Sequence, residues 1–175
     1  FLVYARTNFT PGVRSQEAIT AFIVDRGPGV DTKYLYNLMG CRGGGTARLV
    51  FKDVKVPKEN VLGTVNGGHR VFNTMMIPER LGTAIMTLGS ARVALEIATH
   101  YTTRRKAFGF TINTFQGVSF QVAEGAMLLD AARSLGYTTC RAVDAGEDVK
   151  RVRRMISESK KFITESCQKV VHNAM

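Results

Sequence analysis

The chain has 175 residues, of which 45% are hydrophobic and 22% are charged, and its formal net charge is +10. The hydrophobic fraction is ordinary for a soluble globular protein, and the length allows one or two small cores. No apolar run approaches about 20 residues, so we expect no transmembrane helix. The positive residues are spread over both halves of the chain, and we expect their cluster at 150–154 to form the solvated face of a helix. A basic surface can serve nucleic acid, a membrane surface or an anionic ligand, and no nucleic-acid-binding motif accompanies the charge here.

Cysteine and histidine are few and far apart. The three cysteines, Cys41, Cys140 and Cys167, show no short spacing, and the three histidines are equally scattered. This pattern disfavours a disulfide framework and a zinc site, and it favours a reducing compartment. We therefore expect no metal ion and an intracellular location. The chain starts with Phe1 and shows no signal-peptide pattern, so we expect it to be a piece of a longer protein.

The first third of the chain, residues 1 to about 66, has the pattern of short strands separated by turns. Residues 21–24 form a compact apolar strand, and residues 47–56 alternate apolar and charged side chains. Several such strands with glycine-rich turns predict a β-barrel-like or sandwich-like domain. The triple glycine at 43–45 could cradle a phosphate, but its spacing is not that of a P-loop. A flexible hairpin is the more common meaning of such a run.

From Gly67 the apolar period changes to that of a helix. Three long helical patterns follow: one from Gly67, one over about Gln116–Ala145, and one from about Glu147 to the last residue. Pro78 lacks an N–H group and should kink the first helix, leaving the carbonyl of Thr74 without its partner. The predicted fold class is α+β, with a partial β-barrel-like domain followed by three long antiparallel helices. These helices are one short of a four-helix bundle.

The stretch 101–116, YTTRRKAFGFTINTFQ, forms the corner between the first two helices. It holds three adjacent cations at 104–106, then the aromatic Phe108, and it ends on Phe115 and Gln116. Fixed cations, backbone donors and flat rings at one corner suit a ligand with a phosphate end and a planar end. A solvated basic turn with two phenylalanines capping a core explains the same pattern and is, from the residues alone, the more common case.

Residues 78–81, Pro-Glu-Arg-Leu, are the second chemical signal. A carboxylate between apolar neighbours, beside a kink, can lie against a buried pocket. Burial would make Glu79 a stronger general base, while Arg80 would oppose that change. The alternative is an exposed helical glutamate paired with a nearby arginine, which is the more common case for charged residues on helices.

The corner resembles the acyl-CoA dehydrogenase family through residues 105–109 (RKAFG) and 115–116 (FQ). The resemblance implies that Arg105 binds the pyrophosphate of FAD, that Phe108 lies against the flavin cofactor, and that Gln116 reaches the adenosine part. In that family the segment lies across a subunit interface and holds the FAD of the neighbouring subunit. The resemblance therefore also implies a homodimer or homotetramer.

The resemblance covers nearly all of this chain, which itself covers about half of the family's length. Residues 40–46 fit a Gly-x-Arg-x-x-x-Thr element, and residues 50–63 fit the end of the family's middle β-domain. We therefore expect residues 1–66 to be part of that middle domain. Residues 67–175 would be the C-terminal helical-bundle domain without its last helix. The resemblance also implies a role in fatty acid β-oxidation and an electron-transfer flavoprotein as the electron acceptor. The implied location is the mitochondrial matrix or the bacterial cytoplasm.

The resemblance also gives Glu79 a role. In the isovaleryl-CoA and long-chain branches the catalytic glutamate lies on this helix in a Glu-Arg-Leu context, whereas in most members it lies later than the last residue here. The implied reaction pairs removal of the α-proton of an acyl-CoA by Glu79 with β-hydride transfer to flavin N5, giving the trans-2-enoyl-CoA. Ile77 stands where the medium-chain branch has an aspartate that contacts CoA. The alternatives are a non-catalytic fragment or scaffold that binds no flavin, and an acyl-CoA oxidase.

Overall fold

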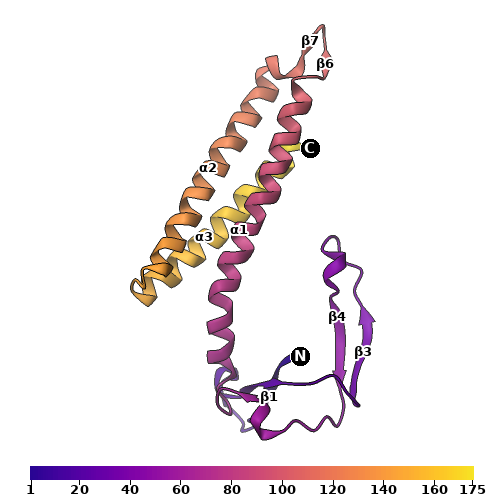
Figure 1. The fold of residues 1–175 in the computed structure, drawn as a ribbon, viewed down its shortest axis with the longest axis vertical. Coiled ribbons are helices and arrows are strands. Elements are labelled where there is room, and N and C mark those ends of the chain that lie inside the picture. The colour runs from indigo at the N-terminus through magenta and orange to yellow at the C-terminus, as the bar shows by residue number, and fades with distance from the viewer. The chain divides into compact units, whose positions relative to one another are not determined.

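A computed structural model describes residues 1–175, with strands in the first part of the chain and three long helices after them (Figure 1). The chain divides into two compact units, Phe1–Thr74 and Met75–Met175. The long helix α1 (Gly68–Thr102) begins in the first unit and continues in the second. This arrangement of small antiparallel sheets and long helices confirms the predicted α+β fold class.

Three strands of the first unit form an antiparallel sheet in the order β1 (Leu2–Arg6), β2 (Ile19–Ile23) and β5 (Val61–Leu62). The central strand β2 buries Thr20 and Ala21 completely. The Thr20 hydroxyl lies 2.6 Å from the Thr7 hydroxyl and accepts the backbone N–H of Asn66 at 2.7 Å. Leaving a buried hydroxyl without partners costs about 1–3 kcal/mol, so these bonds fix the end of β1 and the segment before α1 onto β2.

Two further strands, β3 (Val30–Leu35) and β4 (Ala47–Phe51), form a separate antiparallel pair whose register shifts between Thr32 and Tyr34. The triple glycine at 43–45 lies in the exposed connection between them. The sequence predicted a partial barrel-like domain. The strands observed form two open sheets, and no closed barrel is present.

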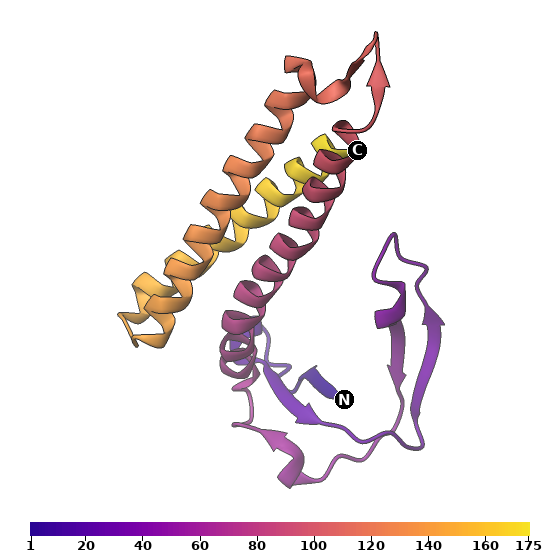
Figure 2. The same cartoon turned by 45° about the horizontal axis from the view of Figure 1, so that its top comes forward.

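The second unit is built from α1, α2 (Gln116–Asp144) and α3 (Val149–Ala174). Figures 1 and 2 show α2 and α3 side by side, with α1 running along them. The three predicted antiparallel helices are thus present, and α2 begins at the residue expected from the sequence. Their core is made of small and aliphatic side chains: Ala84, Ala91, Leu129, Ala132, Ile163, Cys167 and Val170.

Small residues bring the helices of this unit close together. A Cβ atom on Gly125 of α2 would lie 3.0 Å from Cδ1 of Leu95 on α1, so this position has no room for a larger residue without movement. α2 and α3 are also joined by a buried hydrogen bond between the hydroxyls of Thr139 and Ser159, 2.6 Å apart. These contacts fix the register of the three helices.

The turn between α2 and α3 is short and well capped. Gly146 has a φ of +63°, and the Asp148 carboxylate accepts the backbone N–H of Arg151 at 3.0 Å. The cations of the 150–154 cluster are exposed, and Arg151 pairs with Glu147 at 3.1 Å. The predicted solvated helix face is confirmed.

α1 continues through Pro78 as one helix. By length and composition alone it is apolar enough to cross a membrane. One such helix is weak evidence for a membrane span, because the core helices of soluble proteins meet the same criteria. α1 carries Arg80, Arg92 and Glu96 along its length and contributes Ala84 and Ala91 to the core of the second unit.

Candidate functional site

The corner between α1 and α2 is a tight hairpin. β6 (Lys106–Ala107) pairs with β7 (Phe110–Thr111), and the two residues between them, Phe108 and Gly109, have φ of +54° and +85°. Two consecutive residues with positive φ are typical of a type I′ hairpin turn. Glycine adopts this conformation without strain, whereas Phe108 is held in it at a cost of about 1–2 kcal/mol.

The aromatic rings of the corner face outward. Phe108 is 92% exposed, and its ring meets that of Phe115 edge-on, with centroids 6.1 Å apart. Phe110 is exposed as well. The sequence-based alternative, in which two phenylalanines cap a core, is therefore wrong for these rings. An exposed ring held by a strained turn is available to lie against a planar ligand.

The three cations of the corner are exposed, and none of them forms an ion pair. The backbone of Arg105 is held on both sides: its N–H donates to the carbonyl of Tyr101, and its carbonyl accepts the N–H of Ile112, each at 2.9 Å. These two hydrogen bonds fix the backbone of Arg105 and leave its guanidinium free to bind an anion.

Gln116 is the first residue of α2 and is exposed. Phe115 occupies the N-cap position, and no side chain caps this helix end. The free N–H groups of a helix N-terminus favour acceptors and negative charge. The structure therefore brings Phe108 beside Phe115, the residue that precedes Gln116.

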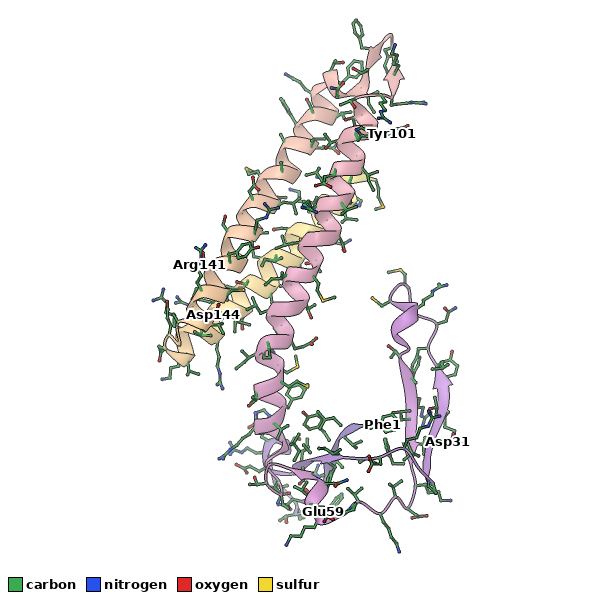
Figure 3. All side chains as sticks on the ribbon, viewed as in Figure 1. Phe1, Asp31, Glu59, Tyr101, Arg141 and Asp144 are labelled. Carbon is green, nitrogen blue, oxygen red and sulfur yellow. The ribbon has the colours of Figure 1, made fainter.

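A cavity of about 280 Å³ lies next to the corner, and sequence reasoning did not find it. Its walls come from the end of α1, the start of α2 and the end of α3, and they include Tyr101 (labelled in Figure 3), Ile112, Gln121 and Asn173. These residues carry no motif, because they come together only through the packing of three helices. The corner consequently has a recess beside its exposed face.

Glu79 lies on an exposed face of α1. Its carboxylate accepts the hydroxyl of Thr83 at 3.2 Å and forms no ion pair, so the predicted alternative of an arginine-paired glutamate is not observed. At about 100° per residue, Met86, Val93 and Ile97 fall within about 40° of Glu79 on the helix. All three are exposed, Met86 at 76%. Glu79 therefore shares its face with an uncovered apolar stripe.

The structure does not bring Glu79 and the corner together. From Glu79 to the end of α1 at Thr102 the helix advances about 35 Å at 1.5 Å per residue. The predicted site residues thus form two groups at separate places in the second unit.

A second cavity, of about 340 Å³, lies in the first unit at the start of α1 and was also missed by sequence reasoning. Tyr4 and Phe72 meet edge-on in its wall, with centroids 5.8 Å apart, and the Tyr4 hydroxyl is buried without a partner. Ser15, Gln16 and His69 add polar groups to the lining. The lining residues are far apart in the sequence, so no spacing signals them. No group of three or more potential metal ligands lies together anywhere in the chain.

Comparison with known proteins gives a consistent match. Residues 66–175 match the family described as "Acyl-CoA dehydrogenase, C-terminal domain". Over 175 residues the chain is 35% identical to the "Caffeyl-CoA reductase-Etf complex subunit CarC" of Acetobacterium woodii, a match that covers 99% of this chain. The solved glutaryl-coenzyme A dehydrogenase–glutaryl-CoA complex is 30% identical, with a TM-score of 0.88 over 99% of this chain. The FAD complex of PigA is 27% identical, with a TM-score of 0.87 over 99% of this chain.

The chain spans less than half the length of these proteins. It covers 45% of the Acetobacterium protein, 43% of the glutaryl-CoA dehydrogenase chain and 44% of the PigA chain.

Proposed function

Because this chain belongs to the acyl-CoA dehydrogenase family, we propose that it is part of an FAD-dependent enzyme that oxidises an acyl-CoA thioester to the trans-2-enoyl-CoA. The observation that carries the proposal is the corner. Three unpaired cations, an exposed ring and an uncapped helix N-terminus lie within residues 104–116. Such a set suits a ligand that carries both phosphates and a flat ring system.

The residues of the corner fit FAD. Arg105 would bind the pyrophosphate through charge-assisted hydrogen bonds, Phe108 would lie against the flavin cofactor, and Gln116 would reach the adenosine part. The likeness to the FAD complex of PigA supports this assignment. When bound, FAD supplies the redox chemistry and accepts the hydride from the β-carbon.

We assign the general base to Glu79. Its carboxylate is engaged only by the Thr83 hydroxyl, which leaves an oxygen free to take the α-proton of the thioester. An exposed carboxylate is a weak base. Covering the apolar stripe beside Glu79 would exclude water from this face and make the carboxylate a stronger base.

One chain cannot supply both Glu79 and the corner to one flavin ring. Glu79 must lie at the reacting carbon, yet the corner begins about 35 Å farther along α1. A site that uses both groups therefore needs two copies, with the corner of one chain reaching the flavin beside Glu79 of another. This supports the proposed homodimer or homotetramer.

The proposed electron acceptor is an electron-transfer flavoprotein, and the proposed location is the mitochondrial matrix or the bacterial cytoplasm. The Acetobacterium relative supports the acceptor, since its name places it in a complex with Etf, and its bacterial source supports the bacterial one of the two locations.

Reduction of an enoyl-CoA is a second candidate, favoured by the same relative, whose name is that of a caffeyl-CoA reductase. In the reductive direction, Glu79 and the residues of the corner would keep the positions proposed for oxidation. Glu79 would donate a proton to the α-carbon instead of removing one, as microscopic reversibility requires. The two directions separate in the assay: an acyl-CoA bleaches the oxidised flavin, whereas an enoyl-CoA restores the colour of the reduced flavin.

The test of the proposed function is the FAD affinity of the full-length protein and of two variants, Arg105→Ala and Arg104→Ala. A guanidinium on a pyrophosphate contributes about 1.5–3 kcal/mol, so Arg105→Ala should weaken FAD binding by about tenfold to 150-fold. Arg104→Ala, which removes a neighbouring exposed cation, should change it far less. Equal affinity in all three proteins would show that the corner is only a turn. A wild type that binds no flavin would favour the non-catalytic scaffold.

A further inference from the structure

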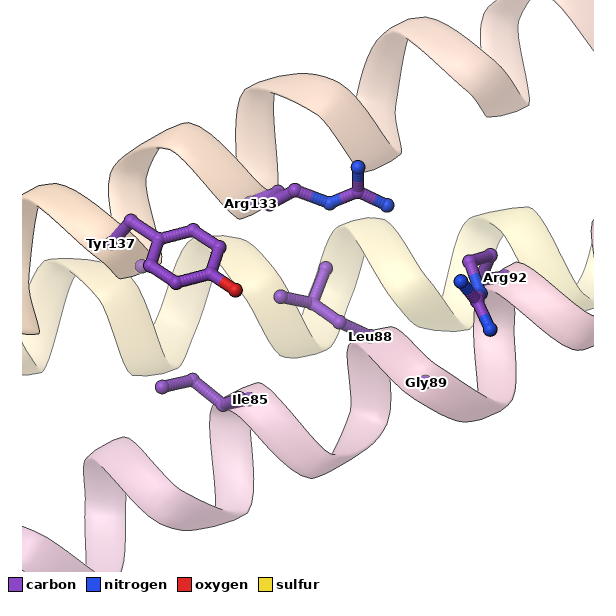
Figure 4. Close-up of a pocket in the computed structure, with 7 residues that line it drawn as sticks. Ile85, Leu88, Gly89, Arg92, Arg133 and Tyr137 are labelled. Atoms are coloured by element: carbon purple, nitrogen blue, oxygen red, sulfur yellow. The ribbon is translucent and has the colours of Figure 1, made fainter.

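A groove between α1 and α2 has no role in the proposed reaction. We call it the arginine groove, and its volume is about 220 Å³. It is lined by Ile85, Leu88, Gly89, Arg92, Arg133, Gly136 and Tyr137. Figure 4 shows Arg133 and Tyr137 projecting from α2, and Ile85, Leu88 and Arg92 from α1, around a common space with α3 behind it. On α1 the lining residues lie at least about 80° from Glu79, so the groove faces away from the proposed base.

The charge of the groove is only partly neutralised within the chain. Arg133 forms no ion pair. Arg92 contacts Glu96 at 3.5 Å, longer than the 2.7–2.9 Å that is usual for a charge-assisted hydrogen bond, so most of its donors stay free. Tyr137 is 62% exposed, and its hydroxyl has no partner. The Arg133 guanidinium and the Tyr137 hydroxyl thus have no acceptor within the chain, and Arg92 has only a long contact with Glu96.

The floor of the groove is apolar and closed from behind. Ile85 and Leu88 form its α1 side, and Gly136 backs onto Ile163 of α3, whose Cδ1 would lie 3.3 Å from a Cβ at this position. Gly89 opens the groove, because a Cβ there would meet no atom within 4 Å. The space therefore combines a cationic rim with a small apolar surface.

We propose that the arginine groove binds a small organic carboxylate, with the acid group at Arg133 and Arg92 and a short aliphatic chain on Ile85 and Leu88. The carboxylate matches the planar donor fork of a guanidinium, and the Tyr137 hydroxyl supplies a third donor. The volume is below the roughly 300–1,000 Å³ of pockets for drug-sized ligands, so the ligand is an acid of a few carbons. The groove lies apart from the corner and from Glu79, and this proposal stands whether or not the chain acts on a thioester.

The test is calorimetric titration of the full-length protein with hexanoate, acetate and inorganic phosphate. Hexanoate should bind at least tenfold more tightly than acetate, since each buried methylene contributes about fourfold. Arg133→Gln should weaken hexanoate binding at least tenfold. Arg141→Gln, which removes an exposed arginine from the same helix outside the groove, should change it by less than twofold.

Gly89→Leu gives a second, steric test that keeps both arginines. The side chain enters open space, so the helix should tolerate it, and it should block hexanoate while leaving the protein folded. Hexanoate binding that survives both Arg133→Gln and Gly89→Leu would belong to another site and would overturn the proposal. Phosphate binding as tight as hexanoate binding would mean a general anion patch and would overturn it too.

Discussion

The ring of Phe108 stands edge-on to the ring of Phe115, with centroids 6.1 Å apart and planes at 89°. This contact ties the tip of the β6–β7 turn to the first residue before α2. The β6–β7 pairing holds Phe108 in a left-handed conformation that a residue with a side chain normally avoids. Strain retained at an exposed position is consistent with a ligand role for the ring rather than a stabilising one.

The strain at Phe108 leads to the first prediction. Asparagine tolerates positive φ well, so Phe108→Asn should leave the full-length protein as stable as the wild type or up to about 1–2 kcal/mol more stable. The same change should weaken FAD binding, because it removes the ring. Denaturant unfolding and flavin titration measure the two effects separately. A loss of stability with unchanged flavin binding would show that Phe108 serves the fold.

Thr139 and Ser159 carry the second prediction. Ser159→Ala should cost about 1 kcal/mol, because the Thr139 hydroxyl keeps its bond to the Leu135 carbonyl at 2.9 Å. Thr139→Val is nearly isosteric, but it leaves the Ser159 hydroxyl buried without that partner and should cost about 1–3 kcal/mol. The double variant should be more stable than the sum of the single losses predicts. Urea unfolding of the four proteins measures this coupling, and strict additivity would mean that the bond does not matter.

The sequence predicted the helices well because their signal is local. The change of apolar period near Gly67 and the Phe-Gln pair at the start of α2 both lie within a few residues of the features they mark. The hairpin at the corner was not predicted, since Phe108-Gly109 lacks the Asn-Gly or Asp-Gly signature of a type I′ turn.

The sites depend on contacts that local patterns cannot show. Tyr4 and Phe72 line one cavity although 68 positions separate them in the chain, and Arg92 and Arg133 line the arginine groove from different helices. The residues alone left two interpretations of Glu79, a carboxylate against a buried pocket and the more common exposed helical glutamate, because the apolar stripe beside it resembles a core-facing stripe in the sequence. A helix pattern gives the face, but the neighbouring segments decide whether that face is covered.

Cys167 carries the third prediction. Burial raises the pKa of its thiol, an effect that a hydrogen bond with Thr87 partly offsets. A thiol whose pKa is higher in the folded than in the unfolded state contributes stability below the unfolded value, about 8.5, and loses it as the pH rises through the folded value. The free energy of unfolding should therefore fall more steeply above about pH 8.5 in the wild type than in Cys167→Ala. Parallel pH profiles for the two proteins would contradict this expectation.

The final prediction is that Glu79 is the general base. Glutamine is nearly isosteric with glutamate and can still accept the Thr83 hydroxyl through its amide oxygen, so Glu79→Gln should keep the fold. It should also keep the flavin, which the corner of another chain would hold. An amide cannot take the α-proton of an acyl-CoA, and the loss of general-base help usually slows a reaction by about a hundred- to ten-thousand-fold.

Rapid mixing of the full-length, flavin-loaded protein with an acyl-CoA measures that step as bleaching of the flavin. Thr83→Val is the matched control, because it removes the hydrogen bond to Glu79 but keeps the carboxylate, and it should slow bleaching far less. Normal acyl-CoA binding with slow bleaching in Glu79→Gln would separate chemistry from affinity. If Glu79→Gln bleaches at the wild-type rate, the base is another residue of the full-length protein, and Glu79 is an ordinary exposed glutamate of α1.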